Sequence, residues 1–106
     1  MKRFNIKDSG ERGWFIGDFD LAVYRTKDFE VNYQVNERRQ TATHVHKIVA
    51  EINLVISGSL VANGEQFGPG EICMFEPGDI CQLEYLEDTT TVTIKVPSVP
   101  TDKHYL

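Results

Sequence analysis

The sequence predicts an all-β fold with little or no helix, in the form of one antiparallel barrel or sandwich. Turn-forming pairs recur at short intervals along the 106 residues, among them Ser57-Gly58, Asn63-Gly64 and Pro77-Gly78. The runs between such pairs are roughly four to eight residues long and rich in Val, Ile, Tyr, Phe and Thr, which is typical of strands in sandwiches and barrels. No segment shows a sustained 3.6-residue period with caps, so no long helix is expected.

The N-terminal half contains one clear strand. In residues 1–13, Phe4 and Ile6 can add an edge strand, and the apolar run Trp14-Phe15-Ile16 is expected to pack in the core or an interface. Residues 29–35 alternate cleanly, with Phe29, Val31, Tyr33 and Val35 on one face. We expect this apolar face to pack in the core.

The C-terminal half supplies a hairpin and a second alternating strand. Asn63-Gly64 separates residues 60–62 from residues 66–67, and Asn-Gly is the favoured pair of a type I′ turn. Residues 91–96 alternate, and Lys95 is expected to face solvent. Residues 97–106 have no pattern and are expected to cross the barrel surface or reach a partner. We expect one domain over residues 1–106, with the barrel at about residues 24–97.

Composition excludes several classes of protein. Hydrophobic residues make up 41% and charged residues 25%, as in ordinary globular proteins. The net charge of −5, with Arg38-Arg39 as the only dense basic pair, argues against nucleic-acid and anionic-membrane partners. No apolar run approaches the roughly 20 residues that cross a bilayer, and no apolar stretch follows the first residues. A cytoplasmic location is the expectation.

The cysteines do not form a recognisable framework. Cys73 and Cys81 are the two cysteines of the chain, and they form no CxxC pair. Without an export signal they are expected to be free thiols, and Cys73 is assigned to the core.

The residues most indicative of chemistry are His44, His46 and Glu51. Residues i and i+2 of a strand point to the same face, so both imidazoles can converge on one point. Glu51 follows after a gap long enough for a tight turn into the next strand. Two histidines and one carboxylate with open positions suit iron, and also manganese, nickel or zinc. Open coordination positions would let a substrate or oxygen bind the metal directly.

These residues resemble the first conserved motif of the cupin superfamily, which continues to Gly58. The stretch from Gly70 to Cys81, with Pro77-Gly78 inside it, resembles the second motif. The resemblance covers nearly the whole chain. It implies a double-stranded β-helix, or jelly roll, with a divalent metal ion near its centre, and it implies a homodimer.

The sequence departs from the cupin pattern at the fourth ligand. The family has a histidine three residues after the glycine of the second motif, and this chain has Cys81 there. Cys81, Leu83 and Tyr85 share one strand face, which is expected to point inward. A thiolate can bind zinc or iron, whereas a buried cysteine can equally pack as a small hydrophobe. Packing is the favoured interpretation.

A second resemblance points to different chemistry. His44-Val45-His46-Lys47 is similar to a stretch of the nucleotide-sugar ketoisomerases, which are cupin-fold enzymes that use histidine as acid or base without a metal. Those enzymes typically have glutamine where this chain has Glu51, and glutamate is the better metal ligand. Lys47 is expected to face solvent at a strand end.

Two further residues are predicted to line the pocket. Asn53 has the strand parity of Glu51 and could hydrogen-bond a ligand, or it could be a cross-strand surface amide. Tyr33 is expected to pack its ring in the core and to present its hydroxyl to the pocket. His104 is expected to be exposed.

Three functions are consistent with these patterns. The first is a metal-binding cupin, either binding or acting on a small carbohydrate-like or carboxylate-like molecule, as a metal-dependent isomerase or dioxygenase if it is an enzyme. The second is a metal-independent ketoisomerase or epimerase in which His44 or His46 moves a proton. The third is a non-catalytic module that binds a small ligand. A homodimer is also expected, because residues 52–56 are apolar on both strand faces and need cover on both.

Overall fold

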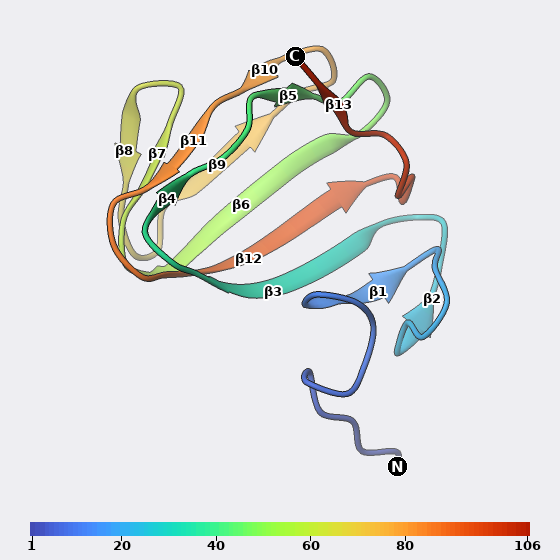
Figure 1. Cartoon of the computed structure of the whole chain (residues 1–106). Helices are drawn as coiled ribbons and strands as arrows, with labels where there is room; N and C mark the ends of the chain where they lie inside the picture. The colour runs from blue at the N-terminus through green and yellow to red at the C-terminus, as the bar shows by residue number, and fades with distance from the viewer.

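The computed structural model describes all 106 residues and contains strands and turns but no helix (Figure 1). It therefore has no helix long and apolar enough to cross a membrane. The strands are β1 (Trp14–Gly17), β2 (Tyr24–Arg25), β3 (Glu30–Asn36), β4 (Arg39–Gln40), β5 (His44–Val45), β6 (Ala50–Ser57), β7 (Leu60–Ala62), β8 (Glu65–Phe67), β9 (Ile72–Phe75), β10 (Ile80–Cys81), β11 (Leu83–Tyr85), β12 (Thr89–Val96) and β13 (His104–Tyr105).

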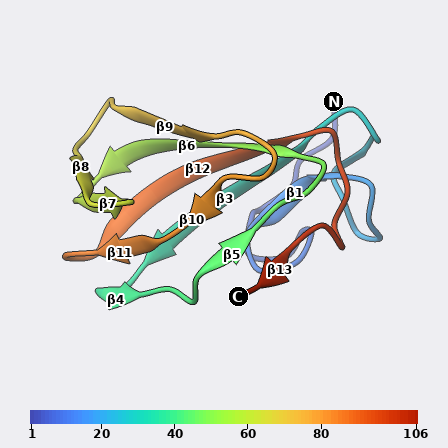
Figure 2. The ribbon, with the colours of Figure 1, turned by 90° about the horizontal axis from the view of Figure 1, so that it is seen from above.

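The strands form a jelly roll of three sheets, as Figure 2 shows from above. A six-stranded sheet has the order β2-β1-β3-β12-β6-β9 and makes one wall. A four-stranded sheet, β4-β11-β7-β8, and a three-stranded sheet, β10-β5-β13, make the opposite wall. The hydrogen bonding does not close into a continuous barrel, because short irregular segments separate β4 from β5 and β10 from β11.

The predicted hairpin is confirmed. β7 and β8 pair antiparallel, with Ala62 opposite Glu65, so Asn63 and Gly64 form a two-residue turn. Asn63 has φ 48° and Gly64 has φ 83°, as a type I′ turn requires of both residues. The predicted edge strand at Phe4 and Ile6 is wrong, since residues 1–10 form turns and irregular backbone.

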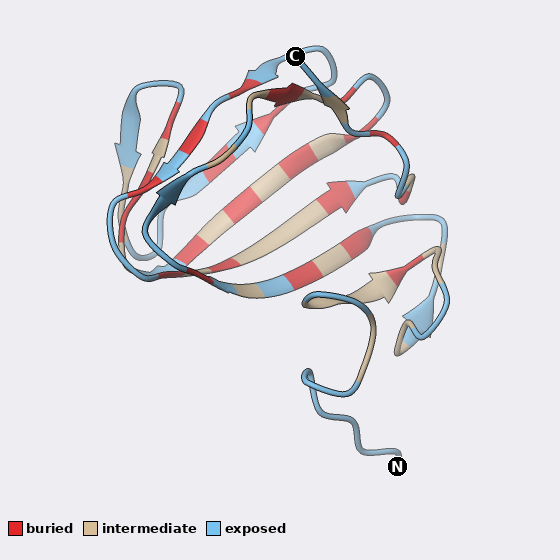
Figure 3. Ribbon diagram, viewed as in Figure 1, coloured by how far each residue is buried: buried red, intermediate tan, exposed pale blue.

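The orientation of β3 is the reverse of the prediction. Its polar residues Glu30, Asn32 and Asn36 are buried, whereas Tyr33 is 41% exposed and Val35 is 60% exposed. An alternation of buried and less buried residues is visible along β3 and β6 in Figure 3. Period-2 alternation shows which residues share a face but not which face points inward. The apolar face of β3 lies outside because the interior at this end of the molecule is polar.

The apolar core adjoins the polar interior, which it meets at Leu83 and Tyr85. It lies between β6 and β9 on one side and β7, β10 and β11 on the other, and Phe67 of β8 packs against it. Its members are Val55, Leu60, Ala62, Cys73, Phe75, Cys81, Leu83 and Tyr85. The inward direction predicted for Cys81, Leu83 and Tyr85 is confirmed, as is the assignment of Cys73 to the core.

The outer face of the six-stranded sheet carries two apolar rows across four strands. One row is Val31, Ile94, Ile52 and Met74, and the next is Tyr33, Val92, Leu54 and Ile72, each following the strand register. Met74 and Ile72 are 55% and 59% exposed. The second face of residues 52–56 is thus apolar and uncovered over much of its extent.

Candidate metal centre

Local backbone geometry brings the predicted residues together. His44 begins β5, His46 follows one residue after its end, and Glu51 lies near the start of β6. One potential ligand atom from each of these residues and from Cys81 lies within 4.8 Å of the others. All four side chains are buried. The i, i+2 parity of the histidines and the turn before Glu51 therefore converge as the spacing predicts.

His46 has its ring fixed by the C-terminal segment. Its Nδ1 hydrogen-bonds the backbone carbonyl oxygen of Asp102, so Nδ1 carries the proton and donates it. Its Nε2 lies 3.2 Å from Glu51 Oε1. In a neutral imidazole this Nε2 is an acceptor, and it would face another acceptor.

His44 has an unpartnered nitrogen. Its Nδ1 lies 3.2 Å from the carbonyl oxygen of Ala42, to which it donates. Its Nε2 is buried and has no hydrogen-bond partner. Burial lowers the pKa of His44 and outweighs the opposing contact with Ala42, which favours a neutral ring with a free lone pair on Nε2.

This donor set fits a divalent cation. The unpartnered Nε2 of His44, and the facing pair formed by His46 Nε2 and Glu51 Oε1, all present electron pairs to one region. A cation or a proton must lie between the acceptors of His46 and Glu51 to make their approach favourable. Two imidazoles and a carboxylate suit iron, manganese, nickel or zinc. His44, His46 and Glu51 would hold the ion.

Glu51 is ionised over nearly the whole pH range. Burial, the largest influence, raises its pKa, but hydrogen bonds with His46 and Asn53 and the charge of Lys95 together outweigh burial and hold the pKa at about 2. Asn53 donates to Glu51 Oε2 at 3.1 Å and accepts from the Thr93 hydroxyl at 2.8 Å. The carboxylate is thereby oriented as well as charged.

Cys81 lies beside the cluster with the surroundings of a packed thiol. It is fully buried, belongs to the apolar core, and its Sγ lies 3.7 Å from the carbonyl oxygen of Asp79. Burial, with the nearby charge of Glu51, raises the pKa of Cys81 to about 12. Its Sγ is also one of the four potential ligand atoms that lie within 4.8 Å of one another, and a bound metal ion deprotonates a coordinating thiol, so this position suits either packing or ligation.

A Cys81→Ser substitution is expected to leave metal affinity nearly unchanged. If Cys81 packs and does not bind the ion, the dissociation constants for both Zn²⁺ and Mn²⁺ should stay within about threefold. If Cys81 is a ligand, zinc affinity should fall more than manganese affinity, because a thiolate prefers the softer ion. Stability should fall by about 1–3 kcal/mol, because a hydroxyl replaces a buried thiol. Titration calorimetry and thermal melts measure the two effects, with Cys73→Ser as the matched buried-thiol control. A selective loss of zinc affinity in Cys81→Ser would assign Cys81 as a ligand.

Asp102 is the main structural residue of the site that the sequence did not indicate. Its carboxylate accepts hydrogen bonds from three consecutive backbone N–H groups, those of Lys47, Ile48 and Val49, at 2.8–3.0 Å. His104 Nε2 also lies 3.2 Å from Asp102 Oδ1. Residues 97–106 thus hold the loop between β5 and β6, and β13 pairs with β5. Residues 97–106, predicted as a tail, therefore form a strap that holds the site, and no local sequence pattern indicates this role.

A polar cavity of about 130 Å³ opens beside the cluster. His44 and Glu51 contribute to its wall, while His46 and Cys81 do not. Asn53 lies in this wall, as predicted. The lining residues are Trp14, Asn32, Gln34, Arg39, Thr41, His44, Glu51, Asn53, Leu83, Tyr85, Thr93, Lys95 and Lys103.

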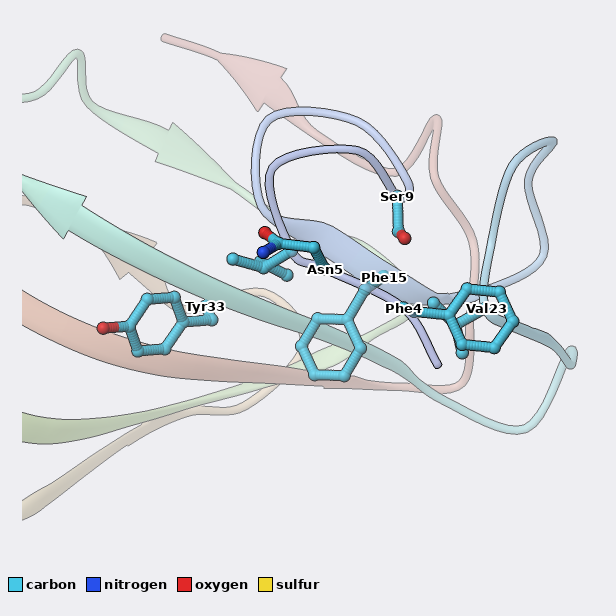
Figure 4. Close-up of a pocket in the computed structure, with 7 residues that line it drawn as sticks. Phe4, Asn5, Ser9, Phe15, Val23 and Tyr33 are labelled. Atoms are coloured by element: carbon cyan, nitrogen blue, oxygen red, sulfur yellow. The ribbon is translucent and has the colours of Figure 1, made fainter. Parts of the chain in front are cut away.

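Tyr33 does not line this cavity, which corrects the prediction. Its ring belongs to the outer face of β3 and lines a separate apolar hollow of about 550 Å³, together with Phe4, Phe15 and Val23 (Figure 4). The error follows from the reversed orientation of β3. The side chains that β3 sends into the cavity are the polar ones, Asn32 and Gln34.

Lys95 was expected to face solvent but is only 8% exposed and lies in the cavity wall. In the strand register it lies opposite Glu30 on one side and Glu51 on the other. Burial, the largest influence, lowers the pKa of Lys95, and Glu51 and Glu30 partly counteract it. Lys95 has the strand parity of Thr91 and Thr93, and this polar face of β12 points inward rather than to solvent.

Comparisons with solved structures identify the fold. A protein with a double-stranded β-helix domain from Klebsiella pneumoniae matches with a TM-score of 0.66 at 20% identity, over 92% of this chain and 85% of that one. A cupin-superfamily sugar phosphate isomerase from Silicibacter pomeroyi matches with a TM-score of 0.57 at 21% identity, over 67% and 52% of the two chains. A variant of PAC13 from Streptomyces, solved with uridine, matches with a TM-score of 0.70 at 14% identity, over 100% and 91%.

These similarities show that the chain has the cupin fold. No family model and no curated protein matches the sequence.

Proposed function

We propose that this chain is a metal-binding cupin-fold protein that acts on a small oxygen-rich molecule. The observation that carries the proposal is the buried, unpartnered Nε2 of His44 beside the facing acceptors of His46 and Glu51. A bound divalent ion would act as a Lewis acid toward a substrate oxygen. The sugar phosphate isomerase with the same fold supports an oxygen-rich substrate.

Some residues of the site would bind that ion, and others orient the side chains that bind it. His44 and Glu51 present ligand atoms at the cavity wall, and His46 lies behind them. Asn53 and Thr93 keep the carboxylate of Glu51 in one orientation through consecutive hydrogen bonds. The backbone carbonyl of Asp102 keeps the proton of His46 on Nδ1, so Nε2 is free to bind an ion.

The test is metal analysis of protein purified without added metal or chelator. The proposal requires close to one equivalent of Fe, Mn, Ni or Zn per chain, or uptake of one equivalent by metal-stripped protein. Failure to bind any of these ions at millimolar concentration would overturn it.

A second function, metal-independent proton transfer, is favoured by one specific contact. His46 Nε2 and Glu51 Oε1 lie 3.2 Å apart, which is the separation of a hydrogen-bonded imidazolium and carboxylate. His44, a neutral residue of the cavity wall with an unpartnered Nε2, would then be the base that removes a proton next to a carbonyl group. Absence of metal binding together with isomerase or epimerase activity that is lost in His44→Gln would support this function.

We also propose that the chain forms a homodimer through the outer face of the six-stranded sheet. The two apolar rows on that face would be covered by the same rows of a second copy, as a two-fold interface allows. A contiguous apolar patch of this kind is uncommon on a monomer.

Leu54→Glu is expected to dissociate this dimer, because Leu54 lies in the centre of the second row and a charge there has no partner. Sedimentation at micromolar concentration should give a dimer for the wild type and a monomer for Leu54→Glu. Ile48→Glu is the matched control, since Ile48 is exposed on the loop between β5 and β6. A monomeric wild type would contradict the proposal.

A further inference from the structure

The cavity has a charge opposite to that of the protein. The chain carries a net charge of −5, yet the cavity wall holds three cationic side chains, Arg39, Lys95 and Lys103, and one carboxylate, Glu51. Glu51 is already engaged by His46 and Asn53. Arg39 and Lys103 are exposed, and Lys95 is buried. A wall of this kind attracts an anionic ligand.

Lys95 is a buried cation without an ion pair. It forms no salt bridge with Glu30 or Glu51, although both lie opposite it on neighbouring strands. Its Nζ lies 4.8 Å from the centroid of the Trp14 ring. A buried ammonium group is costly unless it is paired and hydrogen-bonded. The aromatic contact offsets part of that cost, and an anion in the cavity would complete the pairing.

Asn32 supplies a second unsatisfied group in the same wall. It is 2% exposed, and its Oδ1 has no hydrogen-bond partner, while its Nδ2 donates to the carbonyl oxygen of Arg12 at 3.2 Å. In the strand register Asn32 lies opposite Trp14 on one side and opposite Thr93, two residues before Lys95, on the other. Oδ1 is therefore a buried acceptor near Lys95 that needs a donor from a ligand.

We propose that this part of the cavity recognises a small hydroxylated carboxylate, with its carboxylate on Lys95 and a hydroxyl donating to Asn32. The proposal names the substrate class of the site described under the proposed function, but the recognition itself needs no metal. The hydroxyl requirement comes from Asn32, because the carboxylate alone has no proton to donate.

The cavity volume limits the size of this ligand. At about 130 Å³ the cavity is well below the roughly 300–1,000 Å³ of pockets for drug-sized ligands. A hydroxy acid of about three or four carbons therefore matches it better than a nucleoside. The ligand class is therefore distinct from the uridine that is seen with PAC13.

The experiment uses Trp14, the one tryptophan of the chain, as the reporter. Glycerate, glycerol, propionate and inorganic phosphate are titrated into metal-stripped protein while tryptophan fluorescence is recorded. Glycerate should bind at least about tenfold more tightly than glycerol, which lacks the charge, and than propionate, which lacks the hydroxyls; tenfold corresponds to about 1.4 kcal/mol. Equal affinity for all four, or tightest binding of phosphate, would overturn the proposal.

Three variants assign the binding to the residues. Lys95→Met should weaken glycerate binding at least about tenfold, whereas Lys7→Met, which removes the same charge from the exposed N-terminal segment, should not. Because Lys95→Met leaves Glu30 and Glu51 without a neighbouring cation and can destabilise the fold, Lys103→Met at the exposed rim provides a second test, with a severalfold weakening expected. Unchanged glycerate binding in folded Lys95→Met or in Lys103→Met would contradict the assignment.

Metal titration of the same proteins separates this proposal from the metal site. Glycerate binding that depends on Lys95 in a protein that binds no metal would support the anion site and refute the metal function. Normal metal binding without discrimination between glycerate and glycerol would support the metal function and refute the anion site.

Discussion

His46→Ala and Glu51→Ala are each expected to weaken metal binding by at least about two orders of magnitude, more than the roughly 10–100-fold that follows loss of an outer hydrogen-bonding partner. Each substitution removes one of three favoured ligands. The fold should survive, because the apolar core includes neither residue. Titration calorimetry with Mn²⁺ and Zn²⁺ measures affinity, and circular dichroism checks the fold.

His104→Ala is the matched control for His46→Ala. His104 is a partly exposed histidine of the strap that contacts Asp102 but does not belong to the ligand cluster. Its loss should change metal affinity far less than the loss of His46. Wild-type metal binding in both His46→Ala and Glu51→Ala would remove the basis of the metal-site proposal.

Asp102→Ala is expected to cause the largest loss of stability of the substitutions considered. It leaves the N–H groups of Lys47, Ile48 and Val49 without their acceptor. Val49 is buried, and its N–H without a partner costs about 1–3 kcal/mol, whereas Lys47 and Ile48 are exposed and lose less because water can replace the carboxylate. We expect a total of about 2 kcal/mol or more and a melting temperature lower by about 8 °C or more. Asp8→Ala, which removes an exposed carboxylate, should have little effect.

Asp102→Ala should also weaken metal binding about 10–100-fold, because loss of the carboxylate contacts releases the segment whose backbone carbonyl at residue 102 orients His46. Full stability in this variant would show that other residues hold the strap.

The contribution of Asp102 to stability has a defined pH dependence. Burial is the largest influence and raises its pKa, but hydrogen bonds from Val49, Ile48 and Lys47 outweigh burial and lower the pKa to about 2. Since the folded-state pKa lies below the ordinary value of about 3.9, this stabilisation is complete above about pH 4 and is lost as the pH falls toward 2. Melts from pH 7 to pH 2 should show the difference between wild type and Asp102→Asn shrinking over that range.

The sequence predicted the metal cluster better than the cavity, for a physical reason. The convergence of His44, His46 and Glu51 depends on local spacing, which strand parity fixes. The direction of Tyr33 and Lys95 depends on which face of β3 and β12 points inward, and parity leaves that choice open. Assigning the apolar face to the interior gave the wrong answer for both strands, because this interior is a polar cavity.

Asp102 could not be found from the sequence for a different reason. Its partners lie 53–55 residues away along the chain, and its own segment has no hydrophobic period. Only the tertiary arrangement brings its carboxylate to three adjacent N–H groups. Cys81 lies between these cases: parity predicted that it points inward, while its place between the core and the ligand cluster became apparent only from its neighbours.

The apolar core and the polar cavity share only Leu83 and Tyr85, and this limited overlap has a consequence for evolution. The polar cavity residues Asn32, Gln34 and Thr93 belong to strands β3 and β12, whereas the core cluster draws on β6, β7, β9, β10 and β11. Exchanging one small polar side chain for another in the cavity wall therefore removes little hydrophobic packing. A lineage could change what the cavity accepts through a few such substitutions while the rest of the scaffold stays intact. Divergent ligand preference among proteins with this architecture would then require little compensating change elsewhere in the chain.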